Sequence, residues 1–417
     1  MSAGFADKYL QKQNYSIPII ERPVRENLSI VVVIPCYNEP DICHTISSLL
    51  KCNVVSDINI EIIIVVNDGV SSPENIIAQN NQTYRYLLQD HFPLSDYISI
   101  VPVRISNVVD KKQGAGFARK VGMDLATTRF NQINKSDGVI VSLDADTLVA
   151  PNYFDAIYEY FKSDKKSIGA TINFNHNLEG HLSKENYDAI VLYELHLRYY
   201  KQMLDHIGFP YSFFTIGSAF CVVAITYVKE GGMNDKKAGE DFYFLQKIIP
   251  NGKFGEINNT CVFPSPRFSD RVPFGTGPML QQIKHDRQLK TYALQSFFEL
   301  QFLFQIIPNL YHSDPDIFAS QLPIAVLEFL ETIEWRKIIF ECRKNSGTKE
   351  AFVKRFYNNF NAFRVVKYLN YYHCNYGAKV NVGDAVKTLL KSLGVQFNDN
   401  IGNLELLHIF RNIEIEK

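Results

Sequence analysis

Short runs of apolar, mostly β-branched residues alternate with segments of mixed polarity in the N-terminal part of the chain. The runs occupy residues 28–34, 60–66, 98–103 and 139–143. A run that is apolar at every position is typical of a strand buried on both faces. Strand and helix alternate, which predicts an α/β domain with a Rossmann-like, mainly parallel sheet flanked by helices. The predicted helices cover 40–51, 73–91, 113–129 and 151–162.

The pattern changes in the remainder of the chain. Residues 168–174 are predicted to form another strand, and 182–207 a long helix rich in Tyr and Leu. From about Pro278 the alternation stops and only helices are predicted. We therefore expect three parts, which are an N-terminal arm, an α/β domain and a helical C-terminal region, at residues 1–27, 28–277 and 278–417.

Polar residues gather directly after three of the predicted strands. They are residues 35–39 after the first strand, 67–69 after the second and 144–146 after the fourth. In open α/β sheets, ligands bind beyond the carboxyl ends of the strands. We therefore expect a ligand site at this edge of the sheet.

Asp144 and Asp146 are spaced so that both carboxylates can reach one cation where the chain leaves the sheet. Such oxygens suit Mg²⁺ or Mn²⁺, which typically take one or two carboxylates, waters and substrate phosphate oxygens. The alternative is an aspartate turn or a helix N-cap before Pro151. His176 is a candidate third metal contact or an acceptor-facing residue, although a lone histidine is more often structural.

Gly114 and Gly116 open the helix predicted at 113–129, with cations on either side. Glycines before a helix N-terminus let a diphosphate approach backbone N–H groups closely. A solvated basic face of this helix, which also carries Arg119, is the alternative.

The strand string Val31-Val32-Val33-Ile34-Pro35-Cys36-Tyr37-Asn38-Glu39, together with Asp144-Ala145-Asp146 and Glu240-Asp241, resembles family 2 glycosyltransferases. Their domain opens with a V-x-I-P-x-Y-N-E strand. The resemblance covers roughly residues 28 to 275. It implies the GT-A nucleotide-diphospho-sugar transferase fold and inverting transfer of a sugar from a nucleotide-diphosphate donor, with UDP-sugars favoured by family habit.

The resemblance also implies roles for single residues on the donor side. The opening turn and the acidic residue after the second strand would hold the nucleobase and ribose. The family usually has D-D-G-S or D-x-S after that strand, where this chain has Asn67-Asp68-Gly69-Val70-Ser71. Whether Asn67 or Asp68 contacts the base stays open, and a tight turn is the alternative. The residues carried over are Pro35, Tyr37, Glu39 and Asp68, with Arg119 beneath the donor.

On the acceptor side, the resemblance makes Asp241, beside Glu240, the group that takes the proton of the acceptor hydroxyl while the metal stabilises the leaving diphosphate. Helix capping by acids is the alternative.

Arg267 and Arg271 could each bind phosphate oxygens through two N–H groups, although the family's Q-x-x-R-W string is missing. A surface loop tied down by ion pairs is the alternative for these two arginines.

Composition limits the kinds of binding partner and the cellular compartment that we expect for this protein. A formal net charge of −1 argues against a nucleic-acid partner. Seven cysteines without a C-x-x-C pair, and an N-terminus without secretory signal features, predict a cytoplasmic protein in a reducing compartment. The segment 292–310 is interrupted by polar residues, so it predicts a core helix and no membrane span. Peripheral membrane contact and self-association of the helical region stay open.

The sequence therefore predicts a metal-dependent glycosyltransferase. The expected acceptor is a glycan, a glycolipid head group or a small molecule. One alternative is a sugar-phosphate nucleotidyltransferase, which shares the alternating architecture but typically has a glycine-rich loop with a cation after the first strand. The other is a non-catalytic GT-A-like binding or scaffold protein.

Overall fold

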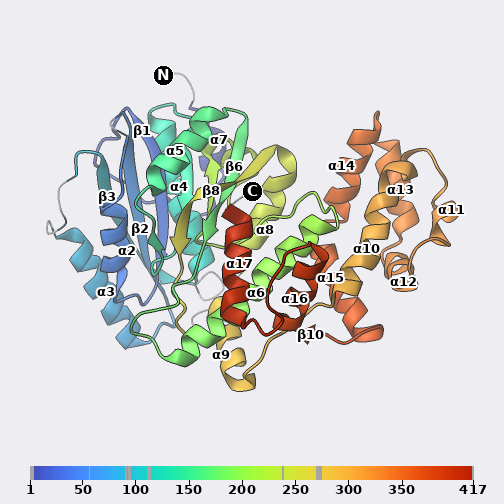
Figure 1. Cartoon of the computed structure of the whole chain (residues 1–417). Coiled ribbons are helices and arrows are strands. Elements are labelled where there is room, and N and C mark those ends of the chain that lie inside the picture. Colours follow the sequence, from blue (N-terminus) through green and yellow to red (C-terminus); the bar gives the residue numbers. More distant parts are fainter. Residues whose placement is uncertain are drawn as a thin grey trace. The chain divides into compact units, whose positions relative to one another are not determined.

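The computed structural model describes residues 4–55, 57–89, 92, 95–109, 114–236, 239–268 and 275–415. They form two compact units (Figure 1). The first unit contains the described residues up to Leu182 and those of Thr215–Met279. The second contains Ser183–Phe214 and the described residues from Leu280 onward. The expected α/β architecture with a helical C-terminal region is confirmed.

The first unit is built on a sheet that has eight strands in the described part of the chain. Their spatial order is β3-β2-β1-β4-β7-β6-β8-β5. The strands β1 and β2 are buried at every position, as their unbroken apolar runs predict. The strands are β1 (Leu28–Cys36), β2 (Asn59–Gly69), β3 (Ile98–Val108), β4 (Val139–Ser142), β5 (Leu148–Val149), β6 (Ser167–Phe174), β7 (Phe220–Val223) and β8 (Lys253–Phe263).

The sheet is parallel in one half and mixed in the other. The strands β3, β2, β1 and β4 pair in parallel, in agreement with the expected βα alternation. Strand β7 runs antiparallel to both of its neighbours, β4 and β6. Strand β8 then pairs in parallel with β6 and antiparallel with β5. A buried apolar run has the same pattern in either direction, so the sequence did not reveal the reversal at β7.

Helix α4 (Ala115–Gln132) packs most closely on the parallel half. A side chain at Gly122 would bring its Cβ within 2.4 Å of Val33 on β1, so only glycine allows this approach. The other helices of this unit are α1 (Asp7–Leu10), α2 (Ile42–Leu50), α3 (Glu74–Leu88), α5 (Tyr153–Ser163), α7 (Ala224–Lys229), α8 (Glu240–Ile248) and the 3₁₀ helix η1 (Ile249–Asn251).

The N-terminal arm is fastened to α4 through one buried carboxylate. The hydroxyls of Tyr9 and Tyr227 donate to Oδ1 of Asp124 at 2.6 Å and 2.7 Å, and that of Tyr15 donates to Oδ2. Lys120 adds a charged donor to Oδ2 at 3.0 Å. A buried charge is stable only when it is paired and hydrogen-bonded, and these four donors satisfy that condition.

The second unit is helical, with one short two-stranded sheet in its described part. The long helix expected at 182–207 is α6 (Lys184–His206). Buried Arg198 on α6 donates to Glu194 Oε1 at 2.8 Å and pairs with Glu414, which fastens α6 to α17. The other elements are β9 (Lys290–Thr291), α10 (Leu294–Ile306), η2 (Ile307–Tyr311), α11 (Pro315–Ala319), α12 (Ile324–Thr332), α13 (Trp335–Lys344), α14 (Lys349–Asn359), α15 (Ala362–Asn375), β10 (Val380–Asn381), α16 (Val382–Ser392) and α17 (Asn403–Ile415), and α9 (Thr276–Asp286) crosses from the first unit into the second.

The segment considered for membrane contact forms α10. Its residues Phe297, Leu300 and Leu303 are fully buried, so it is the core helix that its polar interruptions predict. Among the described helices, none combines the length and the apolar character that a membrane crossing requires.

Candidate active site

A buried arginine on α4 joins the ends of several strands. Arg119 is 3% exposed, so the solvated basic face considered for it is excluded. Its guanidinium donates to Asp144 Oδ1 at 2.9 Å, to Glu240 Oε1 at 3.2 Å and to the carbonyl oxygen of Gly217 at 3.0 Å. It also donates to the hydroxyl of Ser142, at the end of β4. Arg119 thus connects Asp144, after β4, with Glu240, at the start of α8.

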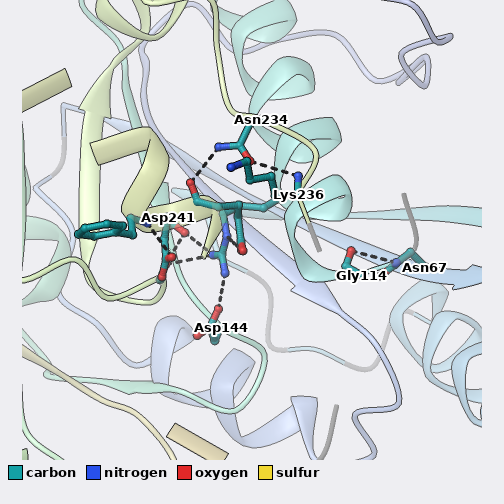
Figure 2. A network of polar contacts seen from close by, with 11 residues as sticks. Asn67, Gly114, Asp144, Asn234, Lys236 and Asp241 are labelled. Carbon is teal, nitrogen blue, oxygen red and sulfur yellow. Dashed lines mark hydrogen bonds and ion pairs between the residues drawn. The ribbon is translucent and has the colours of Figure 1, made fainter. Parts of the chain in front are cut away.

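The charge of Asp241 acts on the same guanidinium group that donates to Asp144, and both aspartates belong to the polar network in Figure 2. Burial acts to lower the pKa of Arg119, but the charges of Asp144, Glu240 and Asp241 outweigh it and hold that pKa above its ordinary value. Arg119 therefore stays charged. It is the cation that pairs with Asp144 and Glu240 and offsets part of the negative charge of Asp241.

The carboxyl group of Asp241 has an unusual proton affinity. Burial is the largest cause that raises its pKa from 3.8 to about 7, and the negative charge of Glu240 raises it further. The positive charge of Arg119 and a hydrogen bond of 2.7 Å from the backbone N–H of Phe242 act in the opposite direction. A carboxylate with a pKa near neutrality is suited to accept a proton at physiological pH.

Gly217 leaves room for this arrangement. A Cβ atom at that position would lie 2.9 Å from Nη2 of Arg119 and 3.1 Å from Oδ2 of Asp241. The segment around Gly217 precedes β7, which is the strand that reverses direction. The absence of a side chain therefore allows the arginine and the aspartate to approach each other there.

A second arginine joins the opening turn to Asp146. Arg267 donates to both carboxylate oxygens of Glu39, and the distance from its Nη1 to Oε1 is 3.0 Å. Its Nη2 also lies 2.8 Å from Oδ2 of Asp146. Glu39 is buried, and Asn38 before it has a left-handed backbone with φ of 50°, which asparagine tolerates. The ion pairs considered for the Arg267 loop are present, and they involve two of the expected site residues.

At the end of β2, the partners of Asp68 differ from the donor contact that was expected for it. The carboxylate of Asp68 pairs with Arg104 on β3 and accepts a hydrogen bond from Nδ2 of Asn80 at 3.4 Å. Asn80 also donates to the carbonyl oxygen of Asn67 at 2.9 Å and accepts from the N–H of Asn38 at 2.8 Å. Sequence reasoning missed Arg104 and Asn80, because they lie inside a strand and a helix without any local signal.

Asn67, by contrast, has a side-chain amide oxygen that can accept a hydrogen bond from a ligand. Its Nδ2 donates to the carbonyl oxygen of Gly114 at 3.4 Å (Figure 2). Its Oδ1 is buried and has no hydrogen-bond partner among the residues that the structure describes. A buried acceptor without a partner is costly, and a bound ligand that donates a hydrogen bond would remove that cost.

The remaining predicted residues are placed as follows. Pro35 is buried near the end of β1, and Tyr37 is partly exposed directly after it. His176 follows β6 and is buried, with its ring against that of Phe174. Within the described ranges, no group of three or more His, Cys, Asp or Glu side chains is arranged to hold a metal ion. Arg271 lies outside the described residues.

Comparison with known proteins gives one family match. Residues 139–311 match the family described as "Glycosyl transferase family group 2". This stretch contains Asp144, Asp146, Glu240, Asp241 and Arg267. No curated protein sequence matches the chain.

Solved structures that resemble the chain include S. aureus TarS. Its residues 1–349 are 13% identical, with a TM-score of 0.38, and the match covers 81% of this chain and 91% of that one. The same fragment in complex with UDP is 11% identical at a TM-score of 0.38, covering 90% and 98%. A longer TarS structure is 12% identical at a TM-score of 0.38, covering 80% of this chain and 55% of that one.

Proposed function

We propose, from the match of residues 139–311 to the family described as "Glycosyl transferase family group 2", that the chain is a metal-dependent, inverting glycosyltransferase. It moves a sugar from a nucleoside-diphosphate donor, with UDP-sugars favoured by the family resemblance, to a hydroxyl group of a glycan, a glycolipid head group or a small molecule. The observation that carries the proposal is that the buried guanidinium of Arg119 donates to Asp144 and also interacts electrostatically with Asp241. A donor-side carboxylate and a base with raised pKa are thereby held in one site.

In this mechanism Asp241 accepts the proton of the acceptor hydroxyl. The acceptor oxygen attacks the anomeric carbon and forms the new C–O bond, while the bond from that carbon to the diphosphate oxygen breaks. The nucleoside diphosphate leaves with that electron pair. Attack from the side opposite to the leaving group inverts the anomeric configuration. Arg119 holds Glu240 and Asp144 in place and keeps part of the Asp241 population ionised.

Asp144 and Asp146 are the residues that would hold Mn²⁺ or Mg²⁺. Their side chains are 39% and 28% exposed, so a cation from solvent can reach both. Each now faces a guanidinium group, of Arg119 and of Arg267 respectively, which supports a preference of this place for positive charge. Waters and donor phosphate oxygens usually complete such a site. The bound metal supplies positive charge that stabilises the leaving diphosphate.

Asn67 is a better candidate than Asp68 for contact with the donor base. Asp68 is occupied by Arg104 and Asn80, whereas the amide oxygen of Asn67 is buried without a partner among the described residues. A nucleobase N–H group would satisfy that oxygen. Pro35 lies near the end of the neighbouring strand β1 and Tyr37 directly after it, at the same edge of the sheet.

The phosphate-containing product that the reaction releases tests the proposed function. The protein is incubated with UDP- and GDP-sugars, Mn²⁺ and a mixture of hydroxyl acceptors, and the released phosphates are separated. Release of a nucleoside diphosphate supports the proposal. A parallel incubation supplies a sugar phosphate and a nucleoside triphosphate, and release of pyrophosphate there would support the nucleotidyltransferase instead. Absence of turnover with every donor would favour the scaffold protein.

The rate is expected to depend on pH through Asp241. Its carboxyl group must be ionised to act as a base, and its pKa is about 7. We expect kcat/KM to rise about tenfold per pH unit below this value and to level off above it. Initial rates between pH 5 and pH 9 measure this. A profile that is flat from pH 5 to pH 7 would exclude Asp241 as the base.

Gly217→Ala is expected to lower kcat by about 10- to 100-fold, because a misplacement of an ångström or less at a catalytic group has effects of this size. The added methyl would displace Arg119 or Asp241. Gly347→Ala is the matched control, since a Cβ atom there has no heavy atom within 4 Å. Equal kcat values for the two variants would show that the close approach at Gly217 is not needed for turnover.

We also propose a cytoplasmic location. All seven cysteines are free thiols, and four of them are buried, which fits a reducing compartment.

A further inference from the structure

Two tyrosines of the helical unit share one carboxylate at its surface. The hydroxyl of Tyr371, on α15, donates to Oε2 of Glu328 on α12 at 3.0 Å, and the hydroxyl of Tyr376 donates to the same oxygen. The centroids of these two rings lie 6.2 Å apart. Tyr376 also stacks on Tyr372, with an interplanar angle of 30°. Hydroxyl and ring contacts together fix the orientation of this tyrosine cluster, which we define as Tyr371, Tyr376 and Glu328.

The tyrosine cluster is accessible to solvent. Tyr376 is 39% exposed, Tyr371 is partly exposed and Glu328 is exposed. Ile324 lies one turn before Glu328 on α12 and is 64% exposed. Side chains four residues apart share one helix face, so Ile324 adds apolar surface beside Glu328. The surface therefore combines exposed apolar area with an anionic oxygen.

We propose that the tyrosine cluster is a carbohydrate-binding site that holds an oligosaccharide. A pyranose ring has an apolar C–H face and an edge of hydroxyl groups. A tyrosine ring offers a flat apolar surface with a polar tip, which suits contact with both parts of a sugar. The second oxygen of Glu328 accepts no hydrogen bond from the described residues, and it can accept one from a sugar hydroxyl.

The fixed orientation of the rings favours binding. Ordering a mobile side chain reduces affinity, and here the two hydroxyl bonds to Glu328 order both rings before a ligand arrives. The inference rests on the proposed function, because an enzyme that adds sugars to a glycan would use this site to retain that glycan. It assigns the helical unit a ligand of its own, separate from the residues around Arg119.

The test measures retention of the full chain, without donor, on immobilised cellohexaose, maltohexaose and chitohexaose. We expect retention on at least one of them. Tyr376→Ala and Tyr371→Ala should weaken it by about tenfold, the size expected when an aromatic contact surface is removed. Tyr376→Phe keeps the ring and should retain most of the binding. Tyr97→Ala is the matched control, because Tyr97 is 37% exposed and lies in the first unit.

Several results would overturn the inference. One is no retention of the wild-type chain on any of the three sugars. Another is unchanged retention of Tyr376→Ala together with a lower melting temperature. That result would show that the cluster only stabilises the packing of α12 against α15. A third is loss of retention in Asp241→Asn, which would place the glycan at the active site. Nucleoside-diphosphate titration of the same variants reports separately on the proposed function, since it should be equal for wild type and Tyr376→Ala.

Discussion

Replacing Asp241 by asparagine is expected to lower kcat by about 100- to 10,000-fold, the range typical for loss of a general base. Asparagine keeps the size of the side chain and cannot accept the acceptor proton. Nucleoside-diphosphate affinity should stay within about twofold of wild type, because the proposed donor contacts are made by other residues. Steady-state rates at pH 8 and calorimetric titration measure the two quantities.

The same substitution is expected to stabilise the fold at neutral pH. The folded-state pKa of Asp241 is about 7 and lies above its ordinary value of 3.8. The contribution of this group to the free energy of unfolding is therefore fully present below about pH 4, and it is lost as the pH rises through 7. Asparagine does not titrate, so the melting temperature of Asp241→Asn relative to wild type should increase between pH 4 and pH 8. A kcat within threefold of wild type, or a variant that is less stable at pH 8, would contradict the assignment.

Arg119→Met is expected to lower the free energy of unfolding by about 3–5 kcal/mol, the usual cost of removing one partner from a buried ion pair. Glu240 and Asp144 would lose their shared cation, and the carbonyl oxygen of Gly217 would lose a charged donor. The loss of positive charge should also raise the pKa of Asp241 and move the pH–rate profile to higher pH. Urea denaturation and the pH profile measure these effects.

Arg336→Met is the matched control for Arg119→Met. Arg336 also pairs with two carboxylates, those of Asp316 and Glu331, but its side chain is 43% exposed. Exposed pairs contribute about 0–1 kcal/mol. Similar losses of stability in the two variants would show that burial does not increase the contribution of Arg119 to the free energy of unfolding.

The main features of the first unit follow from its hydrophobic pattern. The runs at 28–34 and 60–66 are the buried strands β1 and β2, since an unbroken β-branched run has no polar face to expose. The reversal at β7 was not predictable, because strand direction depends on pairing between segments far apart in sequence. The same holds for α6, which lies in the second unit although its sequence precedes β7.

The residue types of the candidate site were visible in the sequence, but their pairing was not. Asp144, Asp146, Glu240 and Asp241 follow strand ends or open a helix, and such positions can be found by pattern. That Arg119 contacts Asp144 and Glu240, and that Arg267 contacts Glu39 and Asp146, depends on tertiary packing. The raised pKa of Asp241 has the same origin, because burial and neighbouring charges are tertiary properties.

Calorimetric titration of UDP and GDP into the purified protein, with and without Mn²⁺, tests the central claim most directly. The variants are Asp146→Ala and, as a control, Asp137→Ala, whose side chain is 62% exposed and lies 3.9 Å from Lys165. We predict binding of one nucleoside diphosphate that requires Mn²⁺, is lost in Asp146→Ala and is unchanged in Asp137→Ala. No binding of either nucleotide by the wild-type protein in the presence of Mn²⁺ would contradict the donor site and, with it, the proposed glycosyl transfer.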